Sequence, residues 1–402
     1  MVLSESKVFK ELLKNYFSEY GISNVQKDSF EELINKRFQE IIDEEPTIEV
    51  NINKREKYIV TFGNVTIDNP HIIEEDRTMR YIYPAEARLR DLTYDGPLCI
   101  DIDEKHLKLI DGNFVIVEHV THNKIPITRI PIMLQTSKCN LYRKTHREIN
   151  IKGECDRDEG GYFIIKGKER VLVTQERINY NIIYVFPQKI NAKYKYIAEI
   201  RSMSDETGHS VLLQAKIDYN GTNICFSLPY ITQDIPASIV FKAMGITDNE
   251  DIKNIVGYGD SRLTKYVNNI IHDPSFMITT KEKALEYISK FTMHTIHKEK
   301  KSVYVEQIFD NELFPHMGVT SSKKENIMFL GLMIKKLIMT YAELRVPDDR
   351  DHISNKRNES SGILIGELFR SLYKRFIRSL QPQLVKRQDI IIAISRYNSI
   401  TH

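Results

Sequence analysis

Apolar residues recur at helical spacing at the start of the chain. In residues 7–17 they are Val8, Leu12, Leu13, Tyr16 and Phe17. A second series follows Asp28, a residue type that often caps a helix N-terminus, and comprises Phe30, Leu33, Ile34, Phe38, Ile41 and Ile42. Steps of three and four positions put each series on one face of a helix. The pattern therefore predicts two amphipathic helices.

From about residue 47 the pattern changes to short β-rich runs separated by Asn, Asp, Gly and Pro. The runs at 47–52, 58–65 and 98–102 predict strands. The third run follows the turn signal Asp-Gly-Pro at 95–97. In it the apolar residues Leu98, Ile100 and Ile102 alternate with Cys99, Asp101 and Asp103. This alternation predicts a half-buried strand with one face turned inward.

Residues 160–175 predict a β-hairpin. A Gly-Gly pair leads into Tyr-Phe-Ile-Ile, Lys-Gly-Lys at 166–168 supplies a turn, and Glu-Arg-Val-Leu-Val-Thr-Gln follows. The apolar runs indicate strands that are buried on both faces. Further strands are expected to about residue 228.

Helical periodicity returns beyond Pro229. Helices are expected through 235–244, from a cap at Thr280 through Ile288, through 325–344 and through 361–379. The most membrane-like segment, 327–334, is far shorter than the ~20 apolar residues of a spanning helix, and we interpret it as a buried helix. The charged N-terminus does not resemble a secretory signal.

Length and composition describe a folded chain of more than one domain. Its 402 residues exceed the roughly 250–300 at which single cores stop growing. Hydrophobic residues make up 41% and charged residues 28%, and the net charge is only +2, so any nucleic-acid surface must be local. The four cysteines form no CxxC pair, which indicates neither a zinc ribbon nor a disulfide framework and fits a reducing, intracellular compartment.

An acidic cluster at VPDDRDH is a candidate magnesium site, because hard cations prefer clustered carboxylate oxygens. Its members are Asp348, Asp349, Asp351 and His352. Arg350 in the middle and Pro347 in front favour a structural explanation, namely turn formation, capping and Asp–Arg pairing. The chain has no HExxH, GxSxG or P-loop spacing.

Three sets of basic residues are candidates for phosphate contacts. In the helix predicted at 361–379, Arg370, Lys374 and Arg378 lie opposite an apolar side made of Leu364, Leu368, Phe369, Leu372 and Phe376. Such a stripe could face phosphates, or it could be a solvated or subunit-contacting face. The other sets, expected to be ordinary turn and loop charges, are Lys166, Lys168, Arg170 and Arg177, and Arg143, Lys144, Arg147 and Lys152.

Five segments resemble, in order, the second-largest, beta-type subunit of the multisubunit DNA-directed RNA polymerases of eukaryotes, archaea and large DNA viruses. They are YPAEARLRDLTY at 83–94, IPIMLQTSKCNLYR at 130–143, the segment 154–186 containing GGYFIIKGKER, LPYITQDIPASIVFKAMGI at 228–246, and 348–375 beginning with DDRDH. The resemblance implies a multidomain α+β protein, with a mixed β-sheet and helix protrusion and an inserted α/β lobe. The implied domains are 1–185, the first part of the protrusion, 186–345, the lobe, and 346–402, the return to the protrusion and the start of the fork.

The resemblance also implies a function. The chain would be part of the second-largest subunit and form one side of the DNA-binding cleft during template-directed RNA synthesis. It implies no cofactor in this chain, because the family carries its magnesium-binding aspartates in the largest subunit. The cleft-facing cations that we select are Lys168, Arg170, Arg177, Lys356, Arg357, Arg370 and Lys374.

The segments that the family carries after its fork are absent, so the chain alone is expected to lack nucleotidyl-transfer activity. Both a split subunit and a partial sequence fit this early end. Expected partners are the largest subunit, a polypeptide with the C-terminal part, other subunits and initiation factors, the DNA template and the RNA–DNA hybrid, and no membrane. The richness in Ile, Asn and Lys and the lack of Trp favour a large DNA virus; the expected location is the nucleus, or the cytoplasm or virion if the source is viral.

Two functions other than that of a polymerase subunit are alternatives. One is a truncated, non-catalytic relative that only binds nucleic acid or polymerase factors. The apolar run at 390–394 argues against such a free-standing domain, because it needs covering. The other is a stand-alone metal enzyme that uses the acidic cluster at 348–352.

Overall fold

The computed structural model describes residues 5–53, 55–110, 113–189, 192–204, 208–257, 261–271, 278, 280–292, 301–318, 322–386, 390–392 and 394. The chain forms two compact units. The first unit comprises Met1–Gln175 and Asn358–His402, and the second comprises Glu176–Arg357. The second unit thus begins before and ends after the expected lobe, 186–345; its assignment as a lobe stays a prediction.

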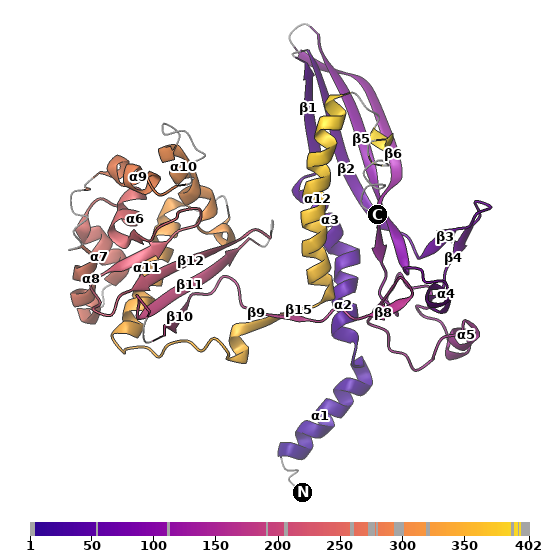
Figure 1. The fold of residues 1–402 in the computed structure, drawn as a ribbon, viewed down its shortest axis with the longest axis horizontal. Helices are drawn as coiled ribbons and strands as arrows, with labels where there is room; N and C mark the ends of the chain where they lie inside the picture. Colours follow the sequence, from indigo (N-terminus) through magenta and orange to yellow (C-terminus); the bar gives the residue numbers. More distant parts are fainter. Residues whose placement is uncertain are drawn as a thin grey trace. The chain divides into compact units, whose positions relative to one another are not determined.

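The first unit begins with the helices α1 (Glu5–Tyr20), α2 (Asn24–Glu32) and α3 (Phe38–Glu44), with a π-helical turn η1 (Leu33–Arg37) between the last two. Both predicted helices are confirmed, but Asp28 lies inside α2 and is not its cap. Helix α1 extends away from the rest of the unit (Figure 1), which leaves its apolar residues exposed. Most apolar residues from α2 to α3, by contrast, are buried in the core, namely Phe30, Leu33, Phe38, Ile41 and Ile42.

A four-stranded antiparallel sheet forms the body of the first unit. It contains β1 (Thr47–Asn53), β2 (Glu56–Ile67), β5 (Asp95–Ile110) and β6 (Asn113–Pro131), in the order β1-β2-β5-β6. Leu98, Ile100 and Ile102 are fully buried, as their alternation predicts, and Cys99 on the other face is buried as well.

Helix α12 (Ser361–Val385) lies along this sheet (Figure 1), although more than 200 residues of chain separate it from β6. The ring of Phe62 in β2 lies 6.1 Å from that of Tyr373, and the ring of Phe38 lies 4.7 Å from that of Phe369. Burial of these rings stabilises the packing of α12 against the rest of the unit.

The predicted apolar face of α12 is partly wrong. Leu368 is 59% exposed and Leu372 is 39% exposed. The residues that are buried instead include the row Phe369, Tyr373, Phe376, Ile377, Leu380 and Leu384. Helices α2 and α3 pack against α12 together with the sheet. Steps of three and four residues allow either row, and the positions of the sheet and of α2 and α3 select between them.

The remaining elements of the first unit are short. They are the paired strands β3 (His71–Ile73) and β4 (Met79–Tyr81), the paired strands β7 (Phe163–Ile165) and β8 (Lys168–Arg170), and the helices α4 (Pro84–Leu89) and α5 (His146–Ile151). The predicted hairpin at 160–175 is confirmed, with Phe163 and Ile164 buried. The prediction that its second strand is buried is wrong, because β8 is an edge strand whose residues are exposed.

The second unit is a five-stranded antiparallel sheet with helices. Its strands, in spatial order, are β10 (Tyr184–Pro187), β11 (Tyr196–Met203), β12 (Ser210–Ile217), β13 (Ile224–Ser227) and β14 (Ile235–Pro236). The helices are α6 (Ala237–Ala243), α7 (Asn249–Gly257), α8 (Thr264–Ile271), α9 (Lys281–Ser289), α10 (Lys301–Gln307) and α11 (Lys323–Tyr341), with the turns η2 (Ser261–Leu263), η5 (Ile308–Glu312), η6 (Pro315–Met317) and η7 (Ile353–Asn355).

Helix α11 contains the membrane-like segment and packs against β11 and β12. Leu330, Met333 and Ile334 are fully buried there, which confirms the interpretation as a buried helix. Among the described residues, no helix is long and apolar enough to span a membrane. The chain passes between the units within β9 (Gln175–Ile178) and returns within β15 (Lys356–Glu359), and these two strands pair.

Replacing Phe369 by Ala should destabilise the first unit by about 3–5 kcal/mol, the usual effect of deleting a buried phenyl ring. The measurement is the free energy of unfolding in urea. The control is Leu368→Ala on the exposed side of the same helix, which should change that energy by less than about 0.5 kcal/mol. Equal effects of the two variants would contradict the assignment of Phe369 to the buried side of α12 and Leu368 to its exposed side.

Candidate nucleic-acid interface

Three of the segments quoted above meet in the first unit around Arg88 and Tyr94. The Arg88 guanidinium donates from Nη1 to both carboxylate oxygens of Glu154, at 2.7 and 2.9 Å, and from Nε to Glu169 Oε1 at 2.8 Å. Its Nη2 donates to the hydroxyl of Tyr162 at 2.9 Å. Burial raises the pKa of the Glu154 carboxyl, while Arg88 opposes that shift. Arg88 thus joins α4 to the segment around β7 and β8.

Tyr94 makes the second junction. Its backbone N–H donates to Ile164 O and its carbonyl accepts from Ile132 N, both at 2.9 Å. Its buried hydroxyl accepts from Asn140 N at 2.9 Å and lies 3.4 Å from Cys139 Sγ. Burial raises the pKa of both Tyr94 and Cys139. Segments 83–94, 130–143 and 154–170 therefore form one hydrogen-bonded assembly, which sequence reasoning did not foresee.

The tip of the β7–β8 hairpin is anchored to the chain just after α4. Gly167 N donates to Leu92 O at 2.9 Å, and Lys166 N donates to Thr93 Oγ1 at 3.2 Å. Gly167 has a left-handed φ of 72°, and a Cβ there would lie 2.5 Å from Asp91 Oδ1. Only glycine fits this turn without strain, so the backbone beneath the hairpin's cations is held in place.

The two faces of β8 differ in charge. Glu169 turns to Arg88, so Lys168 and Arg170 share the opposite face, because alternate residues of a strand point the same way. Both are exposed, and in the described parts of the chain neither side chain has an ion-pair partner. The hairpin therefore presents two cations on an anchored backbone, an arrangement suited to phosphate contacts.

Three of the selected cations lie in the second unit, at β9 and β15. Arg177 Nη1 donates to the Tyr180 hydroxyl at 3.3 Å, and Arg357 Cζ lies 5.5 Å from the centroid of the same ring. Both arginines are exposed. Lys356 instead pairs with Glu176 and, at 3.5 Å, with Asp351. The structure thus brings Arg177 and Arg357 together around one aromatic ring, while acidic groups surround Lys356.

The remaining two cations, on α12, share one acidic partner. Arg370 Nε donates to Glu44 Oε1 at 2.9 Å, and Lys374 Nζ lies 3.8 Å from Glu44 Oε2. The Glu44 side chain is only 9% exposed. These two cations thus help to join α12 to α3, and only Arg378 of the predicted stripe is fully on the surface.

The acidic cluster at 348–352 has structural partners. Asp348 Oδ2 accepts from Val185 N at 2.8 Å, and its Oδ1 accepts from Arg345 Nη2 at 2.6 Å. Asp349 Oδ1 accepts from Asp351 N at 2.9 Å, while His352 caps η7. Within the ranges that the structure describes, no three His, Cys, Asp or Glu side chains are grouped to hold a metal ion. This cluster does not fit a magnesium site.

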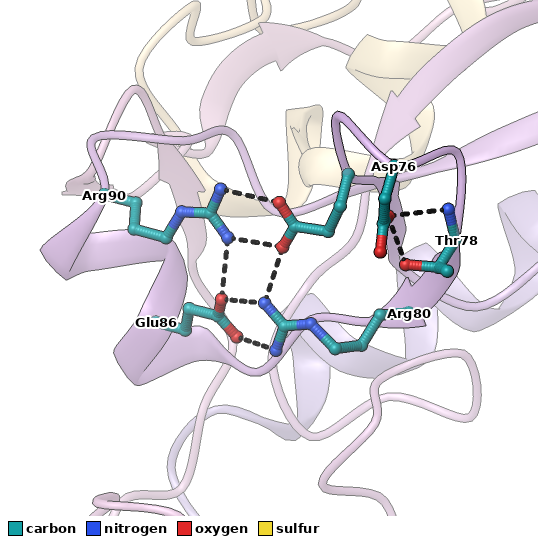
Figure 2. Close-up of polar contacts among 6 residues, drawn as sticks. Asp76, Thr78, Arg80, Glu86 and Arg90 are labelled. Carbon is teal, nitrogen blue, oxygen red and sulfur yellow. Dashed lines mark hydrogen bonds and ion pairs between the residues drawn. The ribbon is translucent and has the colours of Figure 1, made fainter.

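A closed ring of four charges, which the sequence analysis also missed, joins the β3–β4 hairpin to α4 (Figure 2). Arg80 donates to Glu86 Oε2 at 2.9 Å and to Glu74 Oε1 at 2.8 Å, and Arg90 donates to the same two carboxylates at 2.9 Å. Hydrogen bonds from Arg90 and then Arg80 lower the pKa of Glu74 to about 2. The spacing of four residues between Glu86 and Arg90 is a weak signal of this pairing.

This ring predicts a specific acid response. Because the pKa of Glu74 is lowered in the folded state, its contribution to stability is present above the ordinary value of 4.5 and is lost as the pH falls toward 2. Glu74→Gln should therefore lose less thermal stability than the unmodified chain over that pH window. Melting temperatures measured by circular dichroism test this, with Glu75→Gln, an adjacent exposed carboxylate outside the ring, as the control.

The contacts of Arg88 predict a large effect of its removal on the free energy of unfolding. Arg88→Ala leaves the nearly buried Glu154 carboxylate without its cation, which typically costs about 3–5 kcal/mol. Urea unfolding measures the change. Arg147→Ala, on the exposed surface of α5, should have an effect below about 0.5 kcal/mol, and similar values for both variants would show that Arg88 is no junction.

Comparison with known proteins confirms the family resemblance of these segments. The sequence matches the profile described as RNA polymerase beta subunit over residues 21–396. It is 32% identical to DNA-directed RNA polymerase II subunit 2 of Arabidopsis thaliana, over 94% of this chain and 34% of that protein. It is 33% identical to the probable DNA-directed RNA polymerase II subunit RPB2 homolog of Invertebrate iridescent virus 6, over 96% of this chain and 37% of that protein.

An archaeal relative is covered more completely. The chain is 31% identical to DNA-directed RNA polymerase subunit Rpo2N of Methanocaldococcus jannaschii, over 94% of this chain and 74% of that protein. It spans about a third of the length of the polymerase II relatives. With a family profile matched along nearly its whole length, the chain belongs to the RNA polymerase beta subunit family.

Proposed function

We propose that the chain works as the N-terminal portion of the second-largest subunit of a DNA-directed RNA polymerase. The observation that carries this proposal is the family match over residues 21–396, together with the extensive coverage of the archaeal subunit Rpo2N. In this proposal the first unit is the protrusion and the second is the lobe. Together they form one side of the cleft that holds the DNA template and the RNA–DNA hybrid.

The exposed cations provide the proposed contacts with nucleic acid. Lys168 and Arg170 are the strongest candidates, because the anchored hairpin holds them in place and neither is neutralised by a neighbouring carboxylate in the described structure. Arg177 and Arg357 follow, since both remain exposed beside Tyr180. Lys356, Arg370 and Lys374 are weaker candidates, because each already faces an acidic group.

Nucleotidyl transfer is proposed to take place elsewhere in the assembled enzyme. Its Mg²⁺ would be held by the largest subunit, and a further polypeptide would carry the rest of the second-largest subunit. Other polymerase subunits and initiation factors complete the proposed partners. The chain would work inside the cell, in the nucleus or, with a viral source, in the cytoplasm or virion.

The salt dependence of template binding tests the cation assignment. Each lost phosphate contact should reduce the slope of log K against log salt by about 0.9 on duplex DNA. We expect a clear reduction in slope and affinity for the assembled enzyme carrying Lys168→Ala and Arg170→Ala. The matched control replaces Arg143 and Arg147, two exposed cations outside the selected set, by Ala. A slope unchanged in the first variant would refute the assignment of this hairpin.

Mass spectrometry of intact complexes tests the function itself. The tagged chain, purified from its native source in mild salt, should co-purify with a largest-subunit relative and with a polypeptide carrying the remaining part of the second-largest subunit. Recovery of the chain alone, or with nucleic acid only, would favour the non-catalytic binding module instead.

A further inference from the structure

Strand β6 is an edge strand whose first residues, 113–116, lack the usual protection. The order β1-β2-β5-β6 pairs it with β5 on one side, and among the described residues no strand pairs with its other side over 113–123 (Figure 1). Every residue from 113 to 121 is exposed. An unpaired row of backbone N–H and C=O groups can accept a further strand.

The side chains on this edge are apolar. Residues 113–117 read Asn-Phe-Val-Ile-Val, and Phe114 and Ile116 are 48% and 52% exposed. Across the ladder they lie opposite Leu109 and Leu107, so these four residues form an apolar group on one face of the sheet. Natural edge strands are usually protected by Lys or Pro, yet here the first Lys is Lys124 and the first Pro is Pro126.

The regular part of the edge is short. Leu107 pairs with Ile116 but His106 pairs with Glu118, so Val117 is an extra residue that interrupts the ladder. A strand adding to β6 could therefore pair regularly with 113–116 before this bulge.

The chemistry of the edge selects its occupant. Between 113 and 123 the only ionised side chain at neutral pH, apart from any charge on the histidines, is Glu118, so the edge does not complement a nucleic acid or an anionic lipid surface. A second copy of the chain could offer only the same short run, whereas stable dimers use roughly 20–30 residues a side. The occupant must instead be held nearby by contacts elsewhere, which raise its effective concentration.

We propose that β6 receives an extended, uncharged and apolar strand from another polypeptide of the polymerase assembly, which becomes the fifth strand of the first unit's sheet. This inference rests on the proposed function. Backbone hydrogen bonds to 113–116 would supply affinity, and apolar side chains beside Phe114 and Ile116 would supply specificity.

Hydrogen exchange measured on the isolated chain and on the assembled polymerase tests the proposal. The outward-facing amides of 113–116, which are those of alternate residues not hydrogen-bonded to β5, should exchange fast in the isolated chain and at least tenfold more slowly in the assembly. The control is β1, the opposite edge of the same sheet, where exchange should not change. Ile116→Lys should abolish the protection of β6 and weaken retention of one polypeptide in the complex, while Val171→Lys, at another exposed apolar position, should do neither.

The outcomes separate this inference from the function on which it rests. Unprotected β6 amides in an assembled polymerase that contains the chain would overturn the inference and leave the function intact. Protection that appears in the isolated chain and grows with its concentration would indicate self-pairing and would also overturn it. Failure of the chain to enter any polymerase assembly would overturn both.

Discussion

The nearly buried pairing of Arg88 with Glu154 is the contact on which the proposed interface depends. A single guanidinium satisfies Glu154, Glu169 and Tyr162, and so connects α4 with β8 and with the segment that precedes β7. Glu169 pairs with Arg88 on one face of β8. Lys168 and Arg170 therefore lie on the opposite face of the strand. The positive charge on the outer face of β8 thus follows from the contact between Glu169 and Arg88 on its inner face.

The sheet and α12 impose a second constraint. The first unit is discontinuous in sequence, and its core is complete only when α12 supplies Phe369, Tyr373 and Phe376 to the sheet. Ile390 and Ile394 belong to the same core, so the apolar run at the end of the described chain is partly covered within the unit. The core of the first unit therefore needs residues that come before the second unit in the sequence and residues that come after it.

Ion pairing explains how a chain of net charge +2 can offer local basic surfaces. The charges at Glu74, Arg80, Glu86 and Arg90 neutralise one another in a ring (Figure 2). Glu44 likewise faces two cations of α12. The cations left without a carboxylate, such as Lys168 and Arg170, are then available for phosphates. A count of basic residues along the sequence does not distinguish these groups.

Periodicity, turn residues and the five segments are local properties, so the sequence was sufficient to predict many of the helices and strands, the α+β class and the family. It also identified the cap at Thr280 and the burial of α11. It did not predict β6, the longest strand of the first unit. Tertiary packing sets which row of α12 is buried. It also pairs Arg370 and Lys374 with Glu44, and among the described residues it leaves Lys168 and Arg170 without a carboxylate. Those outcomes depend on residues far apart in the chain, such as 44 and 370 or 88 and 154, whose proximity no local pattern specifies.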